Sequence, residues 1–264
     1  MRRAWREFFQ LPLEEKNKYA NSPKTYEGFG SRLGVDKDIV LDWADYFFLN
    51  LLPHSIKSPD KYWPSQPSAL REITEEYANE LFKLCEVLLR LLSTGLGLDE
   101  GHLSRAYGGD DRISACMRVN LYPRCPQPDL TLGLSPHSDP GGLTVLLADD
   151  HVDGLQVRKG DKWIAVRPEP GAFVVNVADQ TQVISNAIYK SVEHRVTANS
   201  KEGRLSFAFF YNPDGDVSIG PAEELVVPSQ RPAIYPTITF NEYRKYVRTR
   251  GPRGKSQVEF LKVN

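Results

Sequence analysis

Cysteine is scarce in this sequence. The 264 residues include three cysteines, Cys85, Cys116 and Cys125, and this small, odd number does not suit a framework of disulfides. We therefore expect reduced thiols, with Cys85 and Cys116 buried. We also expect a cytoplasmic protein, with the nucleus as a second location. The basic N-terminal residues lack the apolar segment of a secretory signal, which favours the same interpretation.

Long apolar runs and an excess of charge of one sign are also absent. No run approaches the roughly 20 apolar residues that a membrane-spanning helix requires. The 33 Lys and Arg residues nearly balance the 34 Asp and Glu residues, which leaves a net charge of −1. This balance provides no long-range field that would attract nucleic acid or an anionic membrane. We expect the partner to be a small-molecule substrate, with no nucleic acid and no membrane involved.

The pattern of residue types changes near residue 109. Before that point, apolar residues at helical spacing predict a long helix over 68–94 that ends at Gly95 and Gly97. A short helix over 14–19 and an aromatic strand over 42–49 precede it. After residue 109, short β-branched runs separated by Gly, Pro and Asp predict strands. These runs cover 114–122, 143–147, 154–158, 163–167, 173–177, 191–197 and 205–211.

One domain is expected over residues 1–264. Many short strands with turn residues between them favour a mainly β fold, either a sandwich or a double-sheet barrel. A helix returns over 240–250, with Thr239 or Asn241 as its cap. The expected divisions are a helical and irregular N-terminal part, a β core and a C-terminal helix region, at 1–108, 109–225 and 226–264.

Two histidines and an aspartate stand out as candidate metal ligands. His137 and Asp139 are one residue apart, and His194 lies on a later predicted strand. Two imidazoles and one carboxylate hold a non-haem Fe(II) on one face and leave the opposite positions open. A His-x-Asp pair alone is equally typical of a loop histidine with an ordinary hydrogen bond. The Pro- and Gly-rich flanks favour the metal interpretation, because they place this pair in a constrained turn next to a strand.

Two polar pairs are candidates for binding a carboxylate. Arg204 and Ser206 are one residue apart on a predicted strand, and therefore point to the same face. Together they present a guanidinium and a hydroxyl to one anion. Taken alone, the pair also fits the start of a surface strand. Asn120 and Tyr122 form a second pair with the same spacing.

These motifs, in this order, resemble the plant 2-oxoglutarate/Fe(II)-dependent dioxygenases. The resemblance covers nearly the whole chain. It is closest to the jasmonate-induced oxygenases in the stretches 23–34, 120–128 and 209–213. The resemblance implies a mainly β fold with flanking α-helices and a double-stranded β-helix, or jelly-roll, core.

The resemblance also implies the chemistry of the site. O₂ and 2-oxoglutarate are the implied co-substrates, with ascorbate as a supporting reductant, and hydroxylation proceeds through a ferryl intermediate. The implied Fe(II) ligands, which form the catalytic centre, are His137, Asp139 and His194. The implied 2-oxoglutarate contacts are Arg204, Ser206, Tyr122 and Asn120.

Arginines are the expected determinants of the substrate. Arg244 and Arg248 share one face of the predicted C-terminal helix, which without the resemblance is typical of a solvated basic face. Arg118 should point into the barrel, where an unpaired cation is costly. A substrate carboxylate would satisfy all three, as expected of enzymes that convert jasmonic acid to 12-hydroxyjasmonic acid in hormone catabolism and plant defence. Phe210 and Phe240 are the expected apolar contacts.

Two alternative functions stay open. One is oxidation of a flavonoid, as in leucoanthocyanidin dioxygenase or flavonol synthase, although a neutral flavonoid offers the three arginines no counter-charge. The other is a catalytically inactive, truncated protein that still binds a ligand. Compared with the family, the sequence lacks a first segment that contributes strands. An uncovered sheet edge favours self-association, so we expect a monomer or a weak homodimer.

Overall fold

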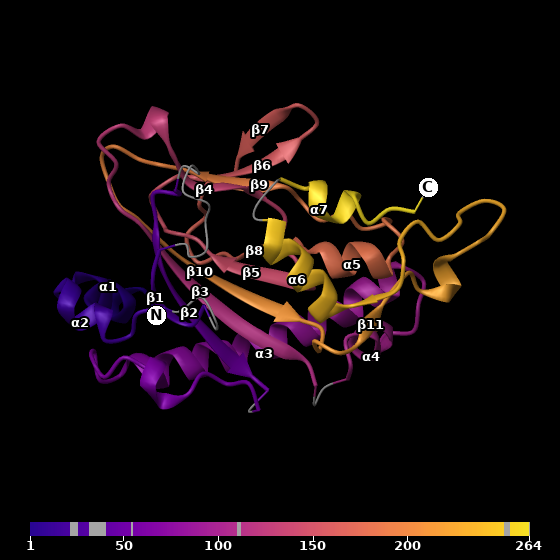
Figure 1. Ribbon diagram of the computed structural model, residues 1–264, viewed down its shortest axis with the longest axis horizontal. Helices are drawn as coiled ribbons and strands as arrows, with labels where there is room; N and C mark the ends of the chain where they lie inside the picture. The colour runs from indigo at the N-terminus through magenta and orange to yellow at the C-terminus, as the bar shows by residue number, and fades with distance from the viewer. Residues whose placement is uncertain (22–25, 32–40, 54, 110–111, 251–253, 264) are drawn as a thin grey trace.

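Two antiparallel sheets face each other at the centre of the protein (Figure 1). The computed structural model describes residues 1–21, 26–31, 41–53, 55–109, 112–250 and 254–263. The six-stranded sheet has the order β1 (Gly28–Gly30), β2 (Asp45–Leu52), β3 (Ser114–Tyr122), β10 (Arg204–Asn212), β5 (Leu143–Leu147) and β8 (Val174–Val177). The four-stranded sheet has the order β4 (Leu132–His137), β9 (His194–Thr197), β6 (Leu155–Lys159) and β7 (Lys162–Ala165), and a separate pair consists of β11 (Ser218–Ile219) and β12 (Ile238–Thr239). This arrangement confirms the predicted mainly β fold with a jelly-roll core.

Side chains alternate between two environments along the paired strands β3 and β10. Met117 and Val119 of β3, like Phe207 and Phe209 of β10, are fully buried in the hydrophobic core on one face of the sheet. The residues between them point to the other face, toward the four-stranded sheet. A slip of one residue would exchange the two faces, so the apolar residues determine the register of the pair.

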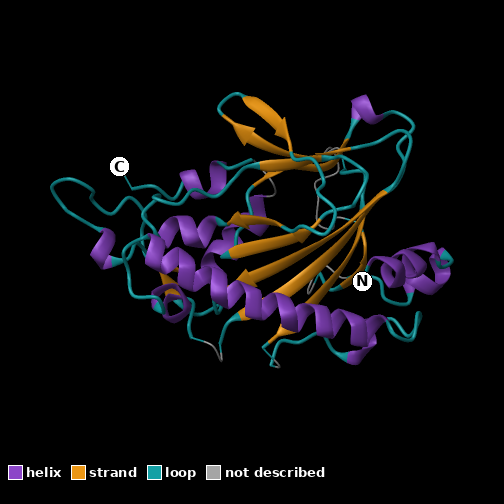
Figure 2. Cartoon of the chain, turned by 180° about the vertical axis from the view of Figure 1, so that it is seen from behind, coloured by secondary structure: helices purple, strands orange, loops and turns teal. Residues whose placement is uncertain are grey.

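The long helix α3 (Leu70–Gly95) covers the outer face of the six-stranded sheet (Figure 2). Its buried residues recur every three or four positions, as in a helix with one apolar face. These residues are Leu70, Thr74, Ala78, Leu81, Cys85, Leu89 and Ser93. The N-terminal helix α1 (Arg2–Gln10) adds Trp5 and Phe8 to the same core, where both rings lie against Phe47.

The remaining helices are short. They are α2 (Leu13–Asn17), α4 (His102–Ala106), α5 (Asp179–Ile184), α6 (Phe240–Arg250) and α7 (Ser256–Glu259), with 3-10 turns at Asp60–Tyr62, Pro128–Leu130 and Glu223–Leu225. No helix in the described part of the chain has the length and apolar character needed to cross a membrane.

Helix α6 begins with a capping box. The Glu242 N–H donates to Thr239 Oγ1 at 3.2 Å, and the Thr239 N–H donates to Glu242 Oε2 at 2.8 Å. Asn241 instead donates from Nδ2 to Asp216 at 3.0 Å. Of the two predicted caps, Thr239 is therefore confirmed and Asn241 is wrong.

Two strands near the candidate metal ligands differ from the prediction. Strand β4 was not among the predicted strands. Gly133 and Pro136 disfavour a strand, and the pairing of β4 with β9 is interrupted by register shifts. Strand β9 was expected to begin at Ser191 but begins at His194. Hydrogen bonds to helix α5 hold Ser191 outside the ladder.

The three cysteines are free. Cys85 is buried in the core, as predicted, and Cys125 is buried as well. The prediction is wrong for Cys116, which is half-buried. Cys116 lies on the face of β3 opposite the core, because it alternates with the buried Ala115 and Met117.

Strands β1 and β2 join the first third of the chain to the main sheet. Strand β2 pairs with β3 from Asp45 to Leu52, and β1 pairs with β2. The sheet therefore crosses the boundary expected at residue 108, and the N-terminal part contributes strands as well as helices. We propose that residues 1–264 form one domain on this basis.

The Asp149 side chain connects the start of β10 to the loop that follows β5 through hydrogen bonds. Its carboxylate accepts hydrogen bonds from the backbone N–H groups of His151, Val152 and Leu205, at 3.1, 3.3 and 3.2 Å. Arg6 lies 3.3 Å from the same carboxylate. Burial alone would raise the pKa of Asp149, but these donors and the Arg6 charge lower it below its usual value.

We expect Asp149→Ala to lower the free energy of unfolding by about 2–3 kcal/mol at pH 7, because it leaves several N–H groups without an acceptor. The pKa is lower in the folded state than in the unfolded state. The stabilisation is therefore complete above the unfolded-state pKa of about 3.9 and is lost as the pH falls through the lower folded-state value. Urea unfolding of both proteins over a series of pH values measures this difference.

Asp150→Ala is the matched control. Asp150 is adjacent and pairs with Arg2 at 2.8 Å, but both side chains are partly exposed. Its loss should cost less than about 1 kcal/mol. Equal losses for the two variants, or a difference that does not depend on pH, would contradict the role assigned to Asp149.

Candidate metal centre and carboxylate pocket

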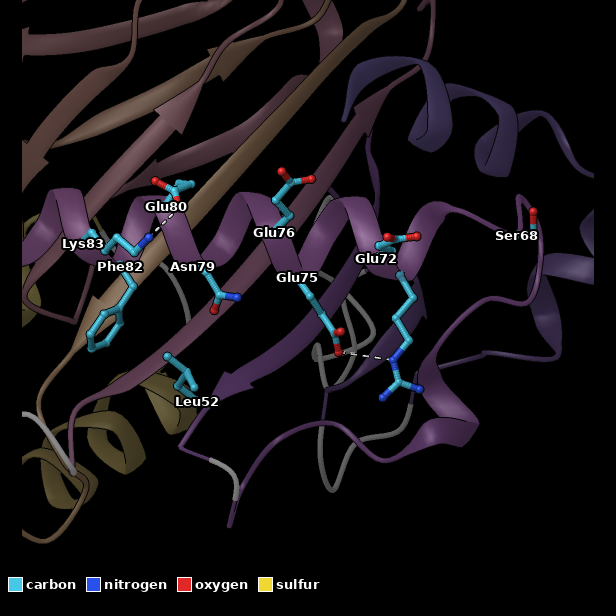
Figure 3. A pocket seen from close by; sticks show the side chains of 10 residues that line it. Leu52, Ser68, Glu72, Glu75, Glu76, Asn79, Glu80, Phe82 and Lys83 are labelled. Carbon is cyan, nitrogen blue, oxygen red and sulfur yellow. Dashed lines mark hydrogen bonds and ion pairs between the residues drawn. The ribbon is translucent and has the colours of Figure 1, made fainter.

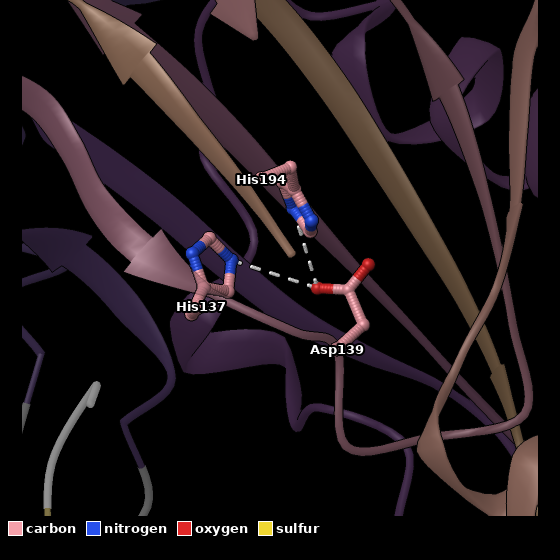
Figure 4. A group of neighbouring side chains, drawn as sticks. All are labelled: His137, Asp139 and His194. Atoms are coloured by element: carbon pink, nitrogen blue, oxygen red, sulfur yellow. Dashed lines mark ion pairs between the residues drawn. The ribbon is translucent and has the colours of Figure 1, made fainter. Parts of the chain in front are cut away.

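The three candidate metal ligands converge between the two sheets. His137 ends β4, His194 begins β9, and the two residues are partners in the ladder that joins these strands. Asp139 follows β4 by two residues. Its Oδ1 atom lies 3.6 Å from His137 Nε2 and 3.8 Å from His194 Nε2 (Figure 4). All three ligand atoms lie within 4.8 Å of one another, as a shared metal ion requires.

Backbone carbonyl groups orient both imidazoles. His137 Nδ1 lies 2.8 Å from the carbonyl oxygen of Ser135, and His194 Nδ1 lies 3.2 Å from that of Val192. A carbonyl oxygen only accepts, so Nδ1 carries the proton in each ring. The unprotonated Nε2 atoms then face Asp139. This is the tautomer that a metal ligand needs.

The protonation states of the site also suit a cation. Burial, together with the neighbouring His194, lowers the pKa of His137 to about 4, so its imidazole is neutral near pH 7. Burial would raise the pKa of Asp139, but the facing imidazoles and the donors Thr144 and Asn176 lower it below its usual value. The site therefore offers a neutral imidazole at His137 and an ionised carboxylate at Asp139, and the set of two histidines and one aspartate fits Fe(II).

Thr144 and Asn176 determine which oxygen of Asp139 is free. The Thr144 hydroxyl donates to Oδ2 at 2.7 Å, and Asn176 Nδ2 donates to the same oxygen at 3.0 Å. Oδ1 is left facing the imidazoles. The sequence analysis did not identify either residue, although both are polar positions in apolar strands and are register partners between β5 and β8.

The predicted carboxylate-binding residues form a block on β3 and β10. Arg204 pairs with Tyr122, and Ser206 pairs with Asn120, across the ladder. Arg204 Nη1 donates to Ser206 Oγ at 3.3 Å, and its guanidinium lies 5.3 Å from the centre of the Tyr122 ring. The register of the strands brings all four predicted residues together.

This block contains a buried cation that lacks a counter-charge. Arg204 is 3% exposed, and burial lowers its pKa. Among the residues that the structure describes, Arg204 has no carboxylate within ion-pair distance, and its Nε atom and the Asn120 Oδ1 atom have no hydrogen-bond partner. An unpaired buried cation is costly, so this pocket is suited to an anion such as a carboxylate.

One cavity joins the metal ligands to the carboxylate block. It lies between the sheets, and Arg118 and Phe210 line it as well. Arg118 stacks on the Tyr46 ring at 4.2 Å and has a buried Nε atom without a partner. The described residues that line it are Arg118, Asn120, Tyr122, Leu134, His137, Asp139, Thr144, Leu146, Leu155, Val157, Val174, Asn176, Val192, His194, Val196, Arg204, Ser206, Ala208 and Phe210.

Helix α6 places the other two predicted arginines in a neighbouring groove. Arg244 and Arg248 line this groove and are close enough for the charge of Arg248 to lower the pKa of Arg244, in addition to the effect of burial. Burial raises the pKa of Cys116, and the charges of Arg244 and Arg248 both oppose this rise. Cys116 lies two residues before Arg118, on the same face of β3. The two arginines therefore lie toward the Arg118 side of the cavity, although they are not part of its lining.

Phe240 is not part of the cavity lining either. Its ring is buried at the start of α6, beneath the Arg244 guanidinium at 5.4 Å. Tyr26 was not predicted to belong to the site, yet it stacks on Arg248 at 5.0 Å. Within the described part of the chain, Arg118, Arg244 and Arg248 have no carboxylate partner.

A second hollow lies on the outer surface of α3, away from the metal ligands (Figure 3). Four of its charged groups form two ion pairs, Arg71 with Glu75 at 3.2 Å and Lys83 with Glu80 at 2.7 Å. None of the candidate metal ligands or carboxylate-binding residues lines it. This groove is therefore not part of the candidate site.

The chain is similar to known proteins along nearly its whole length. The model of the 2OG-Fe(II) oxygenase superfamily matches residues 113–213, and the model described as non-haem dioxygenase in morphine synthesis N-terminal matches residues 1–70. Jasmonate-induced oxygenase 4 of Arabidopsis thaliana is 60% identical over 99% of this chain and 73% of its own length. Flavanone 3-dioxygenase 2 of Oryza sativa subsp. japonica is 43% identical over 91% of this chain and 69% of its own length.

A crystal structure of JOX2 in complex with 2OG, Fe and JA has a similar fold. It superposes with a TM-score of 0.96 at 57% identity, and the match covers 100% of this chain and 77% of that chain. The two sheets therefore have a counterpart in a crystal structure described as a complex with 2OG, Fe and JA.

We expect Thr144→Val to weaken metal binding by about tenfold, because Oδ2 of Asp139 loses its shorter hydrogen bond and the carboxylate is no longer held in one orientation. Thr144→Ser keeps the hydroxyl and should bind metal as the unaltered protein does. Equilibrium dialysis with Co(II) measures both affinities. Equal affinities for the valine and serine variants would show that the hydroxyl does not orient Asp139.

Proposed function

The chain belongs to the 2OG-Fe(II) oxygenase superfamily, and we propose that within it the protein hydroxylates jasmonic acid to 12-hydroxyjasmonic acid. Fe(II) and 2-oxoglutarate are its cofactor and co-substrate, with O₂ as the second co-substrate. The choice of substrate rests on Arg118, which lines the cavity, and on Arg244 and Arg248, which line the neighbouring groove. Among the described residues, none of the three has a carboxylate partner. The names of the similar proteins support the same choice.

The metal centre is proposed to consist of His137, Asp139 and His194. When bound there, Fe(II) activates O₂ at the expense of 2-oxoglutarate and so supplies the oxidant for the substrate. The protein holds both imidazoles through backbone carbonyl groups and the carboxylate through Thr144 and Asn176. These contacts keep the ligand geometry in place before the metal binds, so little reorganisation is needed.

The co-substrate is proposed to bind in the carboxylate block. Arg204 and Ser206 bind the distal carboxylate of 2-oxoglutarate, and Tyr122 adds a hydrogen bond. Asn120 supports the end that meets the metal. The deep burial of Arg204 makes its charge effective, because no solvent screens it.

The substrate carboxylate is proposed to bind Arg118 together with Arg244 and Arg248. One anion in that place neutralises charges that otherwise repel each other. The hydrocarbon part of the substrate then lies in the cavity, against Phe210 and the apolar side chains that face the metal ligands. These side chains exclude water from the reacting carbon. Phe240 supports the Arg244 side chain from below.

Flavonoid oxidation is the second candidate, because a flavanone dioxygenase is also similar to this chain. A neutral flavonoid leaves the three arginines without a counter-charge, and this is why the acid is preferred. We further propose that the protein acts in the cytoplasm as a monomer or weak homodimer. Its cysteines, all free, agree with a reducing compartment, and sedimentation analysis tests the oligomeric state.

We expect the protein, supplied with Fe(II), ascorbate and 2-oxoglutarate in air, to release succinate when jasmonic acid is added. The product should be heavier by one oxygen. The primary amide of jasmonic acid is nearly the same size but neutral, so its turnover should fall by at least about tenfold, as expected for the loss of charge-assisted hydrogen bonds. Coupled succinate and product measurements test this. Preferential turnover of a dihydroflavonol would instead assign the protein to the flavonoid-oxidising group.

Arg204→Gln should raise the KM for 2-oxoglutarate by about 10- to 100-fold, the effect of losing one or two hydrogen bonds to a charged group. Co(II) affinity measured without 2-oxoglutarate should not change, because Arg204 does not contact the metal ligands. Ser206→Ala should have a smaller effect in the same direction. An unchanged KM in Arg204→Gln would show that 2-oxoglutarate binds elsewhere.

A further inference from the structure

A buried carboxylate lies between the metal loop and helix α6. Asp179 is the first residue of α5 and is fully buried. Its Oδ2 accepts hydrogen bonds from Ser138 at 3.1 Å and Tyr243 at 2.7 Å, and its Oδ1 accepts one from Ser191 at 2.6 Å. The three donors belong to three different segments. No lysine, arginine or histidine among the described residues forms an ion pair with Asp179.

One of these segments is the loop that carries two candidate metal ligands. Ser138 stands between His137 and Asp139. The backbone N–H of Asp179 also donates to the carbonyl oxygen of Asp139 at 2.9 Å. Asp179 therefore holds this loop through its side chain and through its backbone.

The second segment leads into the third candidate ligand. Ser191 precedes His194 by three residues, and its backbone N–H donates to Gln182 of α5 at 2.8 Å. The next residue, Val192, supplies the carbonyl group that orients the His194 ring. Fixing Ser191 therefore helps to fix His194.

The third segment is helix α6, which carries the arginines of the proposed substrate site. Tyr243 is fully buried and is followed directly by Arg244. Successive residues are about 100° apart around a helix. The bond from Tyr243 to Asp179 therefore restricts the rotation of α6 about its axis, and with it the direction in which Arg244 and Arg248 point.

We propose that Asp179 is a positioning residue that couples the metal loop to the substrate-binding helix α6 through Ser138 and Tyr243. This inference rests on the proposed function for the role of α6. It predicts that binding at the metal centre stabilises α6, and that a correctly placed α6 keeps the substrate aligned with the metal. The coupling is reciprocal, as linkage requires.

The chemistry of the side chain supports a linking role. An ionised carboxylate offers about four acceptor positions, so it binds donors from several segments at once, whereas an amide has a single acceptor oxygen. Burial raises the pKa of Asp179 to about 6, although the three hydroxyl donors oppose the shift. If Asp179 served packing alone, an apolar residue in its place would avoid the free-energy cost of burying a carboxylate.

The first test compares Tyr243→Phe with a matched control, Tyr107→Phe. Tyr107 is also fully buried, and its hydroxyl bonds to Thr181 of the same helix α5 at 2.5 Å, but it lies outside the three segments described above. Both variants should lower Tm by similar amounts. Only Tyr243→Phe should raise the KM for jasmonic acid, by about fivefold, while leaving the KM for 2-oxoglutarate unchanged. Only this variant should also release succinate without forming hydroxylated product.

The second test needs neither substrate nor turnover. Hydrogen exchange of α6 is measured with and without Co(II) and 2-oxoglutarate. These ligands should protect α6 in the unaltered protein and in Tyr107→Phe, but not in Tyr243→Phe or Ser138→Ala. The double variant, Ser138→Ala with Tyr243→Phe, should lose the protection of α6 to the same extent as either single variant, because each change breaks the same connection through Asp179.

The outcomes separate this inference from the proposed function. If jasmonic acid is not turned over by the unaltered protein but α6 is protected as described, the substrate is wrong and the coupling stands. Suppose instead that jasmonic acid is turned over, but that Tyr243→Phe and Tyr107→Phe show the same protection of α6 and the same KM for jasmonic acid. The coupling is then overturned. Absence of protection in the unaltered protein would also overturn it.

Discussion

The antiparallel pairing of β3 with β10 is the constraint on which the site depends. Its register sets Arg204 opposite Tyr122 and Ser206 opposite Asn120. The same register sends the intervening apolar side chains into the core on the other face. A shift by one residue would bury the charges against α3 and expose the aromatic rings, so the stability of the core and the position of the anion pocket have one cause.

The cavity and the neighbouring groove combine three different electrostatic environments. The ligand atoms near Asp139 are suited to a cation, Arg204 is suited to a buried anion, and the arginines near Arg118 are suited to a second anion. Each of these charges is costly to bury alone. Binding of the metal, the co-substrate and the acid would therefore each neutralise one part of the site. The protein keeps the separate charges apart because they lie on strands whose backbone hydrogen bonds are already formed.

Much of this arrangement follows from local sequence patterns. Alternation along 114–122 places Arg118 on the same face as Asn120 and Tyr122, and the spacing of Arg204 and Ser206 places these two residues on one face, without knowledge of the fold. Thr144, Asn176 and Asp179 were missed for a physical reason. Asn176 and Asp179 act on Asp139 or its loop through contacts that join distant parts of the chain, and Thr144 acts across the turn that leads into β5. No periodicity marks such contacts. Strand β4 was missed because its residues disfavour a strand and only the partner β9 holds them in one.

The two anion sites are built on supports of different stiffness. The residues proposed to bind 2-oxoglutarate lie on central strands that are hydrogen-bonded on both sides, whereas Arg244 and Arg248 lie on helix α6 outside the main sheet. Helix α6 is held by the capping box at Thr239, by the buried Phe240 and by the bond from Tyr243 to Asp179. Substitutions on α6 therefore change the substrate-binding groups without disturbing the sheet. In the proposed coupling, the buried carboxylate of Asp179 keeps α6 aligned with the metal loop, because it accepts hydrogen bonds from both.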